Sequence, residues 1–267
     1  MLKPPDLAGS SLRKARELTL GRRTTVVNEF LGGSDRVDFY KLNTKNRSSF
    51  RVDLQRFKTN IDVELIQDLN KNGKVERGEV LATSRNLGKL PESINIVGLE
   101  RGTFYLRVYN RSRIQTPYRL SAAAGALPSN PAATFAYDVV TATNALRKQY
   151  GLTAFAINTQ LTKAAQLYSQ QMALGDFIGS TAPDGATPET RIRQAGYIPT
   201  WWGENVAVSY PTPTEVVNAW INSDIHRRNI LSPELREVGV GYYYLANDTG
   251  VNNWNVYWTQ LFGSPSA

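Results

Sequence analysis

The stretch VVNAWINSDIHRRNIL, residues 216–231, combines one apolar helix face with the single histidine of the 267-residue chain, His226. Val216, Val217 and Trp220 recur at helical spacing, so we expect a helix that packs them into a core. A lone imidazole beside two arginines and an asparagine fits three roles: a catalytic base, part of a metal site, or a structural side chain. The flanking sequence must decide between these roles.

The sequence on both sides of this stretch predicts a layered α/β/α domain over residues 135–267, because helices precede strands within one compact unit. The third helix has Thr212 as a suitable N-cap and Pro213 in its first turn. The expected elements are helices at 135–150, from the N-cap Asn158 onward and at 212–222, and paired strands at 237–246 and 254–263.

The first half of the chain predicts a different architecture, a β-sandwich domain over residues 1–123. Its segments are short, alternate apolar and polar side chains, and are separated by turn residues. The uncharged, Pro-containing stretch AGALPSNPAAT, residues 124–134, is the expected linker. The fold class is therefore a two-domain α+β chain. The expected strands are 36–42, 49–54, 61–67, 79–84, 93–99, 102–110 and 118–123.

Charge divides the chain in the same way. Residues 1–124 hold 23 Lys and Arg against 13 Asp and Glu, a net +10, whereas residues 125–267 carry 8 against 10, a net −2. The basic half could meet a polyanion or could be an ordinary solvated surface. No nucleic-acid-binding motif is present, so a specific nucleic-acid partner is not expected.

A calcium-like loop, DLNKNGKVERGE at residues 68–79, lies between two expected strands and fits the pattern D-x-[DN]-x-[DN]-G-x5-E. Strands flank it instead of the helices of an EF-hand, and three basic residues lie within it, so any affinity for Ca²⁺ should be weak. The alternative is a polar hairpin loop. The candidate ligands are Asp68, Asn70, Asn72, the Lys74 carbonyl, Glu76 and the bidentate Glu79.

The second half resembles bacterial secreted members of the CAP superfamily. The resemblance lies in LTKAAQLYSQQMA (161–173), TAPDGATPETRIRQAGY (181–197), GENVAV (203–208), the opening stretch and EVGVGYYY (237–244), in that order. It implies an α/β/α sandwich with a central cleft in which two histidines and one or two acidic residues converge.

Carried over position by position, the resemblance implies a degenerate cleft. Ser180 stands where the family has its first histidine, and Ser223 where many members have a second acid. Glu204 and His226 are retained, with Asn229 three residues after the histidine. Zn²⁺ sites normally need at least three protein ligands, so no zinc is expected in the cleft.

Three roles for His226 remain open. It could be structural, hydrogen-bonded to Glu204 and orienting the loop after the third helix. It could contact a polar ligand together with Glu204. It could also be the base of a Ser180, His226 and Glu204 triad. Beside the cleft, Trp201 and Trp202 are expected mainly in the core, the alternative being that one stacks on a sugar or covers a lipid.

The first half resembles the bacterial pre-peptidase C-terminal domain, through AGSSLRKARELTL (8–20), LGGSDRVDFYKL (31–42), VELIQDLNKNG (63–73) and LERGTFYLRVY (99–109). This family is a β-sandwich appended to secreted enzymes and surface proteins. The resemblance implies an accessory role in adhesion or secretion.

Together these features predict an extracellular or envelope-associated binding protein whose cleft engages a lipid, glycan or protein partner. The alternative is a secreted, peptidase-like hydrolase. The first residues, MLKPPDLAGS, contain no apolar stretch of signal-peptide length, and no apolar run is long enough to cross a bilayer. The absence of cysteine excludes disulfides and thiolate metal sites.

Overall fold

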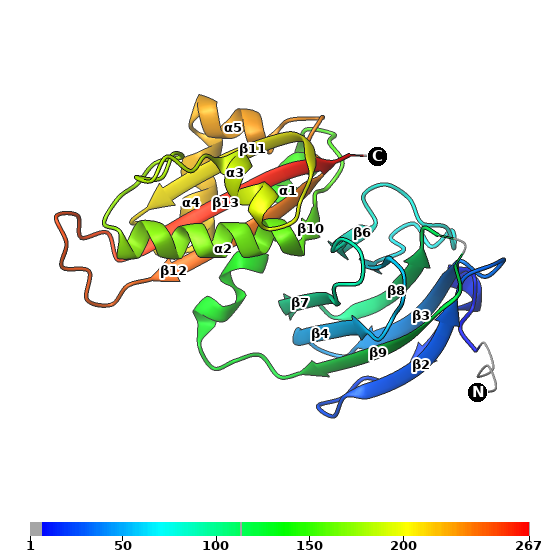
Figure 1. Ribbon diagram of the computed structural model, residues 1–267. Coiled ribbons are helices and arrows are strands. Elements are labelled where there is room, and N and C mark those ends of the chain that lie inside the picture. The colour runs from blue at the N-terminus through cyan, green and yellow to red at the C-terminus, as the bar shows by residue number, and fades with distance from the viewer. Residues whose placement is uncertain (1–6, 113, 267) are drawn as a thin grey trace. The chain divides into compact units, whose positions relative to one another are not determined.

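The computed structural model describes residues 7–112 and 114–266. The chain divides into two compact units, Met1–Ala133 and Thr134–Ala267, which we call the β-sandwich unit and the CAP unit (Figure 1). The boundary falls inside the expected linker. Strand β9 extends into that linker as far as Gly125, and a short 3-10 helix, Pro131–Thr134, ends it.

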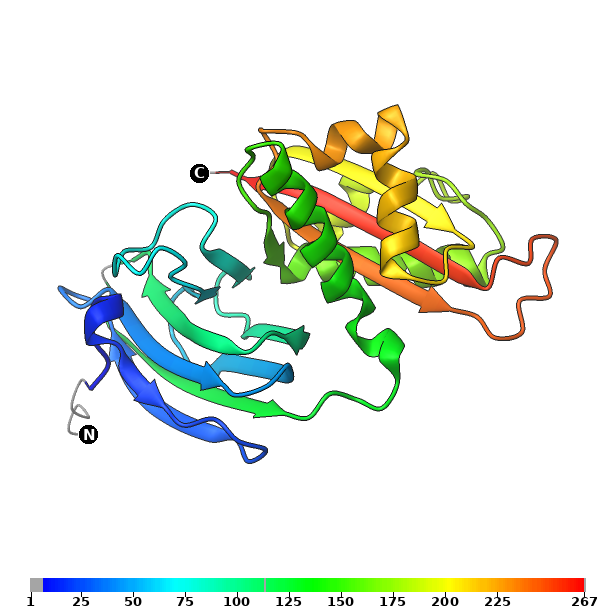
Figure 2. The ribbon, with the colours of Figure 1, turned by 180° about the vertical axis from the view of Figure 1, so that it is seen from behind.

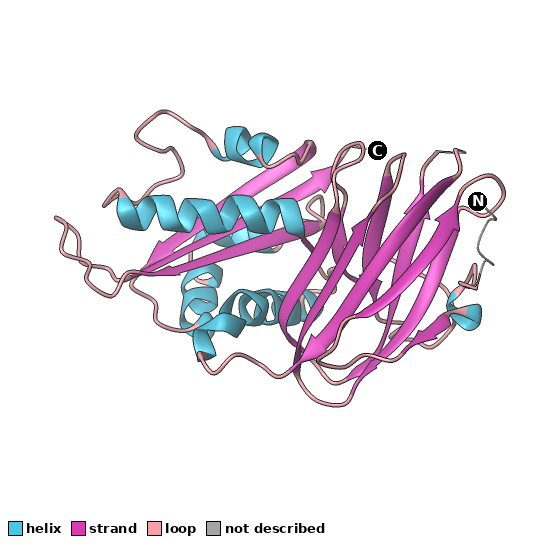
Figure 3. Cartoon of the chain, turned by 60° about the horizontal axis from the view of Figure 1, so that its bottom comes forward, coloured by secondary structure: helices cyan, strands magenta, loops and turns pink. Residues whose placement is uncertain are grey.

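The β-sandwich unit consists of two sheets, in agreement with the expected fold (Figure 3). One has the strand order β1-β3-β8-β5-β6 and the other β2-β9-β4-β7. All seven expected strands are present within two residues of their expected ends, and two strands, β1 and β2, were not expected. The strands are β1 (Arg16–Leu18), β2 (Thr25–Leu31), β3 (Val37–Thr44), β4 (Ser48–Gln55), β5 (Ile61–Ile66), β6 (Val80–Ser84), β7 (Glu92–Leu99), β8 (Gly102–Asn110) and β9 (Thr116–Gly125).

Alternation of side chains along the strands builds the core of this unit. Phe50, Val52 and Leu54 of β4 are buried, and so are Phe104 and Leu106 of β8 in the other sheet. The residues between them, on the opposite face of each strand, are exposed or half-buried. This is the period-two pattern of strands that pack one face onto a core.

The CAP unit is an α/β/α sandwich around a sheet with the order β10-β12-β13-β11. Helices α2 and α3 cover one face (Figure 1), and α1 and α4 cover the other (Figure 2), which α5 joins. The elements are α1 (Phe135–Gln149), β10 (Ala156–Asn158), α2 (Thr159–Leu174), α3 (Pro188–Gln194), β11 (Pro199–Val208), α4 (Pro213–Ile221), α5 (Asp224–Ile230), β12 (Glu237–Tyr244) and β13 (Val256–Pro265).

Local chemistry starts the helices where the sequence predicted. The Asn158 side chain accepts hydrogen bonds from the backbone amides of Gln160 and Leu161. Thr212 and Glu215 form a reciprocal capping box at the start of α4. The segment after the third expected helix contains a further helix that the sequence did not predict, α5, and His226 lies in it.

Two glycines of β12 let α2 lie against the sheet. A Cβ atom at Gly239 would come within 2.1 Å of the Leu161 backbone, and one at Gly241 within 2.2 Å of the Ala165 backbone. Helix and strand therefore touch through their backbones, which fixes the position of α2 over β12 and the neighbouring β13.

Candidate functional site

The buried centre of the CAP unit is the ion pair of Glu204 on β11 with Arg191 on α3. Arg191 Nη2 donates to Glu204 Oε2 over 2.6 Å and to the Ser180 carbonyl over 2.8 Å. Its guanidinium carbon lies 3.3 Å from the centroid of the Tyr168 ring. Arg191 therefore links the carboxylate, the Ser180 segment and α2, and it occupies the space beside Glu204.

The environment of Glu204 favours its neutral form only in part. Burial raises the pKa of Glu204, and Arg191, followed by the Ser180 side chain, lowers it. Glu204 Oε1 is buried and has no hydrogen-bond partner among the described residues. The Ser180 hydroxyl therefore approaches the carboxylate without closing a hydrogen bond to that oxygen. Ser180 itself is exposed.

His226 lies in a separate polar cluster on α5. Asn229 Nδ2 donates to the Glu204 carbonyl over 2.9 Å and to Asn205 Oδ1 over 2.8 Å. Asn205 Nδ2 donates to the His226 carbonyl over 3.3 Å. The half-buried imidazole makes no hydrogen bond or ion pair with any described residue, and burial lowers the pKa of His226. Ser223 is the N-cap residue of α5, but its side chain makes no cap hydrogen bond.

The five candidate cleft residues divide between the two faces of the sheet. On β11, the Glu204 side chain points to the α2 and α3 face, where Arg191 binds it. The next residue, Asn205, must point to the opposite face, where it contacts α5. Ser180 thus joins Glu204, whereas Ser223, His226 and Asn229 belong to α5 on the other face. The expected hydrogen bond between His226 and Glu204 is not formed.

Trp201 and Trp202 at the start of β11 are both exposed, at 58% and 42%, so the expectation of core packing was wrong. Their cross-strand partners on β13 are Ser264 and Gly263, which are too small to cover an indole. Strand β11 is also the last strand of its sheet, so no strand of the described residues lies on its other side. Edge position and small partners together leave both tryptophans exposed, one on each side of the strand, because successive side chains of a strand point to opposite faces.

The 68–79 loop of the β-sandwich unit is wound around its own acidic and amide side chains. Asp68 accepts from the Asn72 and Gly73 amides over 3.1 and 3.0 Å. Glu79 is buried and accepts from the Leu69 and Glu76 amides, each over 3.0 Å. Two further side-chain oxygens turn inward, because Asn70 Oδ1 accepts from the Asn72 amide and Asn72 Oδ1 from the Lys74 amide.

The fit of this loop to calcium depends on amide and carbonyl oxygens as well as on carboxylates. No group of three His, Cys, Asp or Glu within residues 7–112 and 114–266 is arranged to hold a metal ion. Glu76 is turned toward the Asn70 and Asn72 amide nitrogens. A cation in the loop would therefore be held by Asp68, Glu79, asparagine oxygens and a backbone carbonyl, a donor set suited to weak Ca²⁺ binding.

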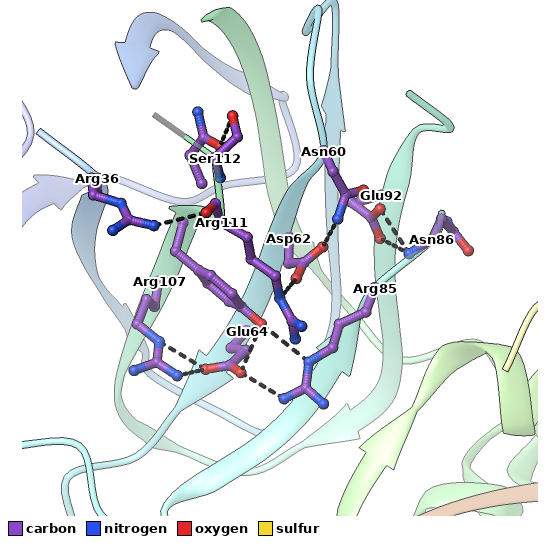
Figure 4. A network of polar contacts seen from close by, with 12 residues as sticks. Arg36, Asn60, Asp62, Glu64, Arg85, Asn86, Glu92, Arg107, Arg111 and Ser112 are labelled. Carbon is purple, nitrogen blue, oxygen red and sulfur yellow. Dashed lines mark hydrogen bonds and ion pairs between the residues drawn. The ribbon is translucent and has the colours of Figure 1, made fainter. Parts of the chain in front are cut away.

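A polar network that the sequence did not predict covers the outer face of β5 (Figure 4). Glu64 is paired with Arg85 over 2.9 Å and with Arg107, whose Nε donates over 2.8 Å. Asp62 is paired with Arg111 over 3.2 Å. Acidic residues alternating with apolar ones on β5 are the sequence signal for such a network. Both carboxylates are matched within the network, Glu64 by two arginines and Asp62 by one.

Comparison with known proteins places the second half of the chain in a family. Residues 140–262 match the CAP family, described as the Cysteine-rich secretory protein family. An uncharacterized protein, YkwD of Bacillus subtilis (strain 168), is 39% identical over 116 residues, 43% of this chain and 45% of that protein. The chain thus spans less than half the length of this curated relative.

Solved structures similar to parts of this chain include two from Bacillus anthracis. One is an extracellular protein containing a SCP domain from Bacillus anthracis, with 19% identity, a TM-score of 0.44 and coverage of 60% of this chain and 51% of that chain. Another is the pre-peptidase C-terminal domain of a Bacillus anthracis collagenase, with 19% identity, a TM-score of 0.32 and coverage of 40% and 92%.

No helix among the described residues is long and apolar enough to span a membrane. The GEN strand and the α5 segment of the C-terminal unit lie in the matched range, and so do its other helices and strands except for the start of α1 and the end of β13. Residues 140–262 therefore form a CAP domain, and the chain joins this domain to a preceding β-sandwich.

Proposed function

We propose that this chain is a secreted or envelope-associated binding protein whose CAP unit binds a glycan at the β11 edge, where Trp201 and Trp202 present one ring on each side of the strand. We call these two rings the tryptophan surface. The observation that carries the proposal is their joint exposure, while Trp220 and Trp258 of the same unit are buried. Large aromatic faces held in water at a rigid strand are typical of binding surfaces, where stacking recovers the cost of exposing them. The β-sandwich unit would be an accessory module for adhesion or targeting.

The geometry of the polar residues favours binding over hydrolysis. A triad needs its nucleophile and base in hydrogen-bonding reach, but Ser180 and His226 lie on elements that cover opposite faces of the sheet. The Glu204 carboxylate is held by Arg191 and does not orient the imidazole. These contacts support a structural role for Glu204 and leave His226 for contact with a ligand.

Cosedimentation of the full chain with purified peptidoglycan tests the glycan proposal. We expect the wild-type chain to sediment with the polymer and the double variant Trp201→Ala/Trp202→Ala to lose most of this binding. The matched control is Tyr244→Ala, which removes another exposed aromatic, at 56% exposure, from the end of β12. Equal loss in both variants, or no loss in the double variant, would contradict the proposal.

The same assay separates binding from the hydrolase alternative. A binding protein leaves the polymer intact, so the supernatant should contain no newly released soluble fragments after prolonged incubation. Fragment release that persists in the double variant but stops in His226→Ala would instead favour hydrolysis.

We further propose that the 68–79 loop holds Ca²⁺ weakly. The support is the inward turn of the Asp68, Asn70 and Asn72 oxygens, with Glu79 fixed at the end of the loop. Gly73 adopts a φ of +74°, which the sharp turn at this position requires. The role of the ion would be to fix a loop that now relies on hydrogen bonds alone.

A further inference from the structure

A pocket of about 400 Å³ opens on the β-sandwich unit beside the 68–79 loop. Lys41 of β3 and Tyr105 of β8 are cross-strand partners on its floor. They alternate along their strands with the buried Tyr40, Phe104 and Leu106, so they face away from the core. We call this the basic pocket, and its lining is Leu12, Arg13, Lys41, Asp68, Lys71, Gly73, Thr103 and Tyr105.

Three cationic side chains reach the basic pocket from three separate segments. Lys71 makes no hydrogen bond or ion pair with any described residue and is exposed. Lys41 is paired only with Glu17, which is itself 74% exposed, so solvent weakens that pair. Arg13 donates one hydrogen bond to the Asn72 carbonyl over 3.0 Å. Much of the donor capacity of these groups remains available to a ligand.

The single acidic group of the lining does not neutralise these cations. Asp68 already accepts two backbone hydrogen bonds from Asn72 and Gly73. One carboxylate against three cations leaves the basic pocket positive, and its concave shape concentrates that field. An anionic group is therefore the chemistry that the pocket favours.

Two other lining residues indicate what the anion is attached to. Tyr105 is half-buried and offers an aromatic ring, and Thr103 is exposed and carries a hydroxyl. An aromatic ring, a hydroxyl and several donors in one small concave site suit a sugar ring. A nucleic-acid strand would need a row of aromatic side chains for successive bases, whereas this lining contains one ring.

We propose that the basic pocket binds an anionic sugar unit of a polymer, with Lys41, Lys71 and Arg13 contacting its carboxylate or phosphate. The site lies in the β-sandwich unit and does not depend on the tryptophan surface or on calcium in the loop. The positive net charge of the first half of the chain would then serve a defined binding site. It would not act only as a general attraction for polyanions.

Isothermal titration of the full chain with a short oligogalacturonate, in chelator so that Ca²⁺ cannot bridge, tests the proposal. The test variant is Lys41→Gln/Lys71→Asn, because Lys71 has a φ of +57° that asparagine tolerates. We expect binding to weaken by about tenfold when two pocket cations are removed. The methyl ester of the same oligosaccharide lacks the charge. It should bind the wild-type chain no more tightly than the charged oligosaccharide binds the variant. Oligomeric glycerol phosphate, tested in parallel, distinguishes a phosphate from a carboxylate as the preferred anion.

The matched control is Lys45→Gln/Lys89→Asn, which lowers the net charge equally through two exposed lysines outside the pocket. It should change the affinity by less than about twofold, because distant exposed charges are screened by salt. The proposal is overturned if this control weakens binding as much as the pocket variant does, if the methyl ester binds as well as the acid, or if neither anionic oligomer binds.

Discussion

Two buried glutamates, Glu92 in the β-sandwich unit and Glu204 in the CAP unit, are stabilised by different partners. Glu92 is fully buried and is bonded by neutral groups: the Ser84 hydroxyl over 2.5 Å and the Asn86 amide over 2.8 Å. Burial is the main cause that raises the pKa of Glu92 to about 8. Glu204 is equally enclosed, but a guanidinium neutralises part of its charge.

The comparison separates two ways of keeping a carboxyl group inside a protein. Hydrogen bonds from neutral donors compensate only a small part of the free-energy cost of burying a charged carboxylate. Glu92 therefore keeps its proton, and the stability of the β-sandwich unit depends on pH. A cationic partner instead stabilises the charged carboxylate directly. The stability of the CAP unit therefore depends on the presence of Arg191. Arg191 also occupies the space beside Glu204.

Removing Arg191 from its pair with Glu204 should have the largest effect on stability. We expect Arg191→Leu to lower the free energy of unfolding of the CAP unit by about 3–5 kcal/mol, since Glu204 is then buried without a partner. Arg193→Leu, on the same helix, breaks only the exposed pair with Glu189 and should cost about 0.5 kcal/mol or less. Urea unfolding followed by the helical circular dichroism signal measures both, because α1–α5 lie in this unit. Similar losses in the two variants would remove the distinction.

Glu92, which is bonded by neutral donors only, should make the stability of the β-sandwich unit depend on pH. The unfolded chain ionises Glu92 near its ordinary value of 4.5, and the folded chain near about 8. Between these values only unfolding releases the proton, so the contribution of Glu92 to stability is greatest below pH 4.5 and falls by up to about 1.4 kcal/mol per pH unit toward pH 8. Scanning calorimetry from pH 5 to 8 should show this fall in the wild-type chain and a much smaller one in Glu92→Gln. Parallel pH profiles would mean that Glu92 ionises normally in the fold.

Calcium should have a moderate effect. With a dissociation constant on the order of 10⁻⁴–10⁻³ M, 10 mM Ca²⁺ would stabilise the β-sandwich unit by about 1–3 kcal/mol, and micromolar Ca²⁺ hardly at all. Glu79→Gln should remove most of the rise in melting temperature. Asn130→Ala, in the linker, should leave it intact. Identical melting curves in millimolar Ca²⁺ and in chelator would make the loop a hairpin turn only.

Zinc should have the smallest effect. We expect calorimetry of the full chain to show no stoichiometric micromolar Zn²⁺ site, in the wild type or in His226→Ala. Ser180→His should not create one, because the new imidazole would lie on the Glu204 face, across the sheet from His226. A site that appears in Ser180→His and needs His226 would show that the two faces communicate.

The sequence predicted those features that depend on contacts between residues close together in the chain. It failed for features that depend on distant partners. The caps at Asn158 and Thr212 and the wound 68–79 loop depend on contacts within a few residues, so their patterns are visible locally. Strand β11 escaped prediction because Glu204 and Asn205 are polar yet buried, and Asn205 is bonded to a residue as distant as Gln260. A period-two test reads such a segment as a loop.

The candidate cleft was incomplete for the same reason. Arg191 carries no local signal that marks it as the partner of Glu204, and a single sequence does not reveal which face of a sheet a helix covers. Likewise, the exposure of Trp201 and Trp202 follows from the edge position of β11 and the small residues of β13, neither of which a sequence pattern contains.

The placement of the tryptophans also makes the protein its own optical reporter. All five, Trp201, Trp202, Trp220, Trp254 and Trp258, lie in the CAP unit, and the β-sandwich unit has none. Indole fluorescence therefore follows one half of the chain only. Its long-wavelength component comes mainly from the two exposed rings and should respond to quenchers, while the buried Trp220 and Trp258 stay shielded until the unit unfolds. An unfolding transition without a fluorescence change can then be assigned to the β-sandwich without cutting the chain.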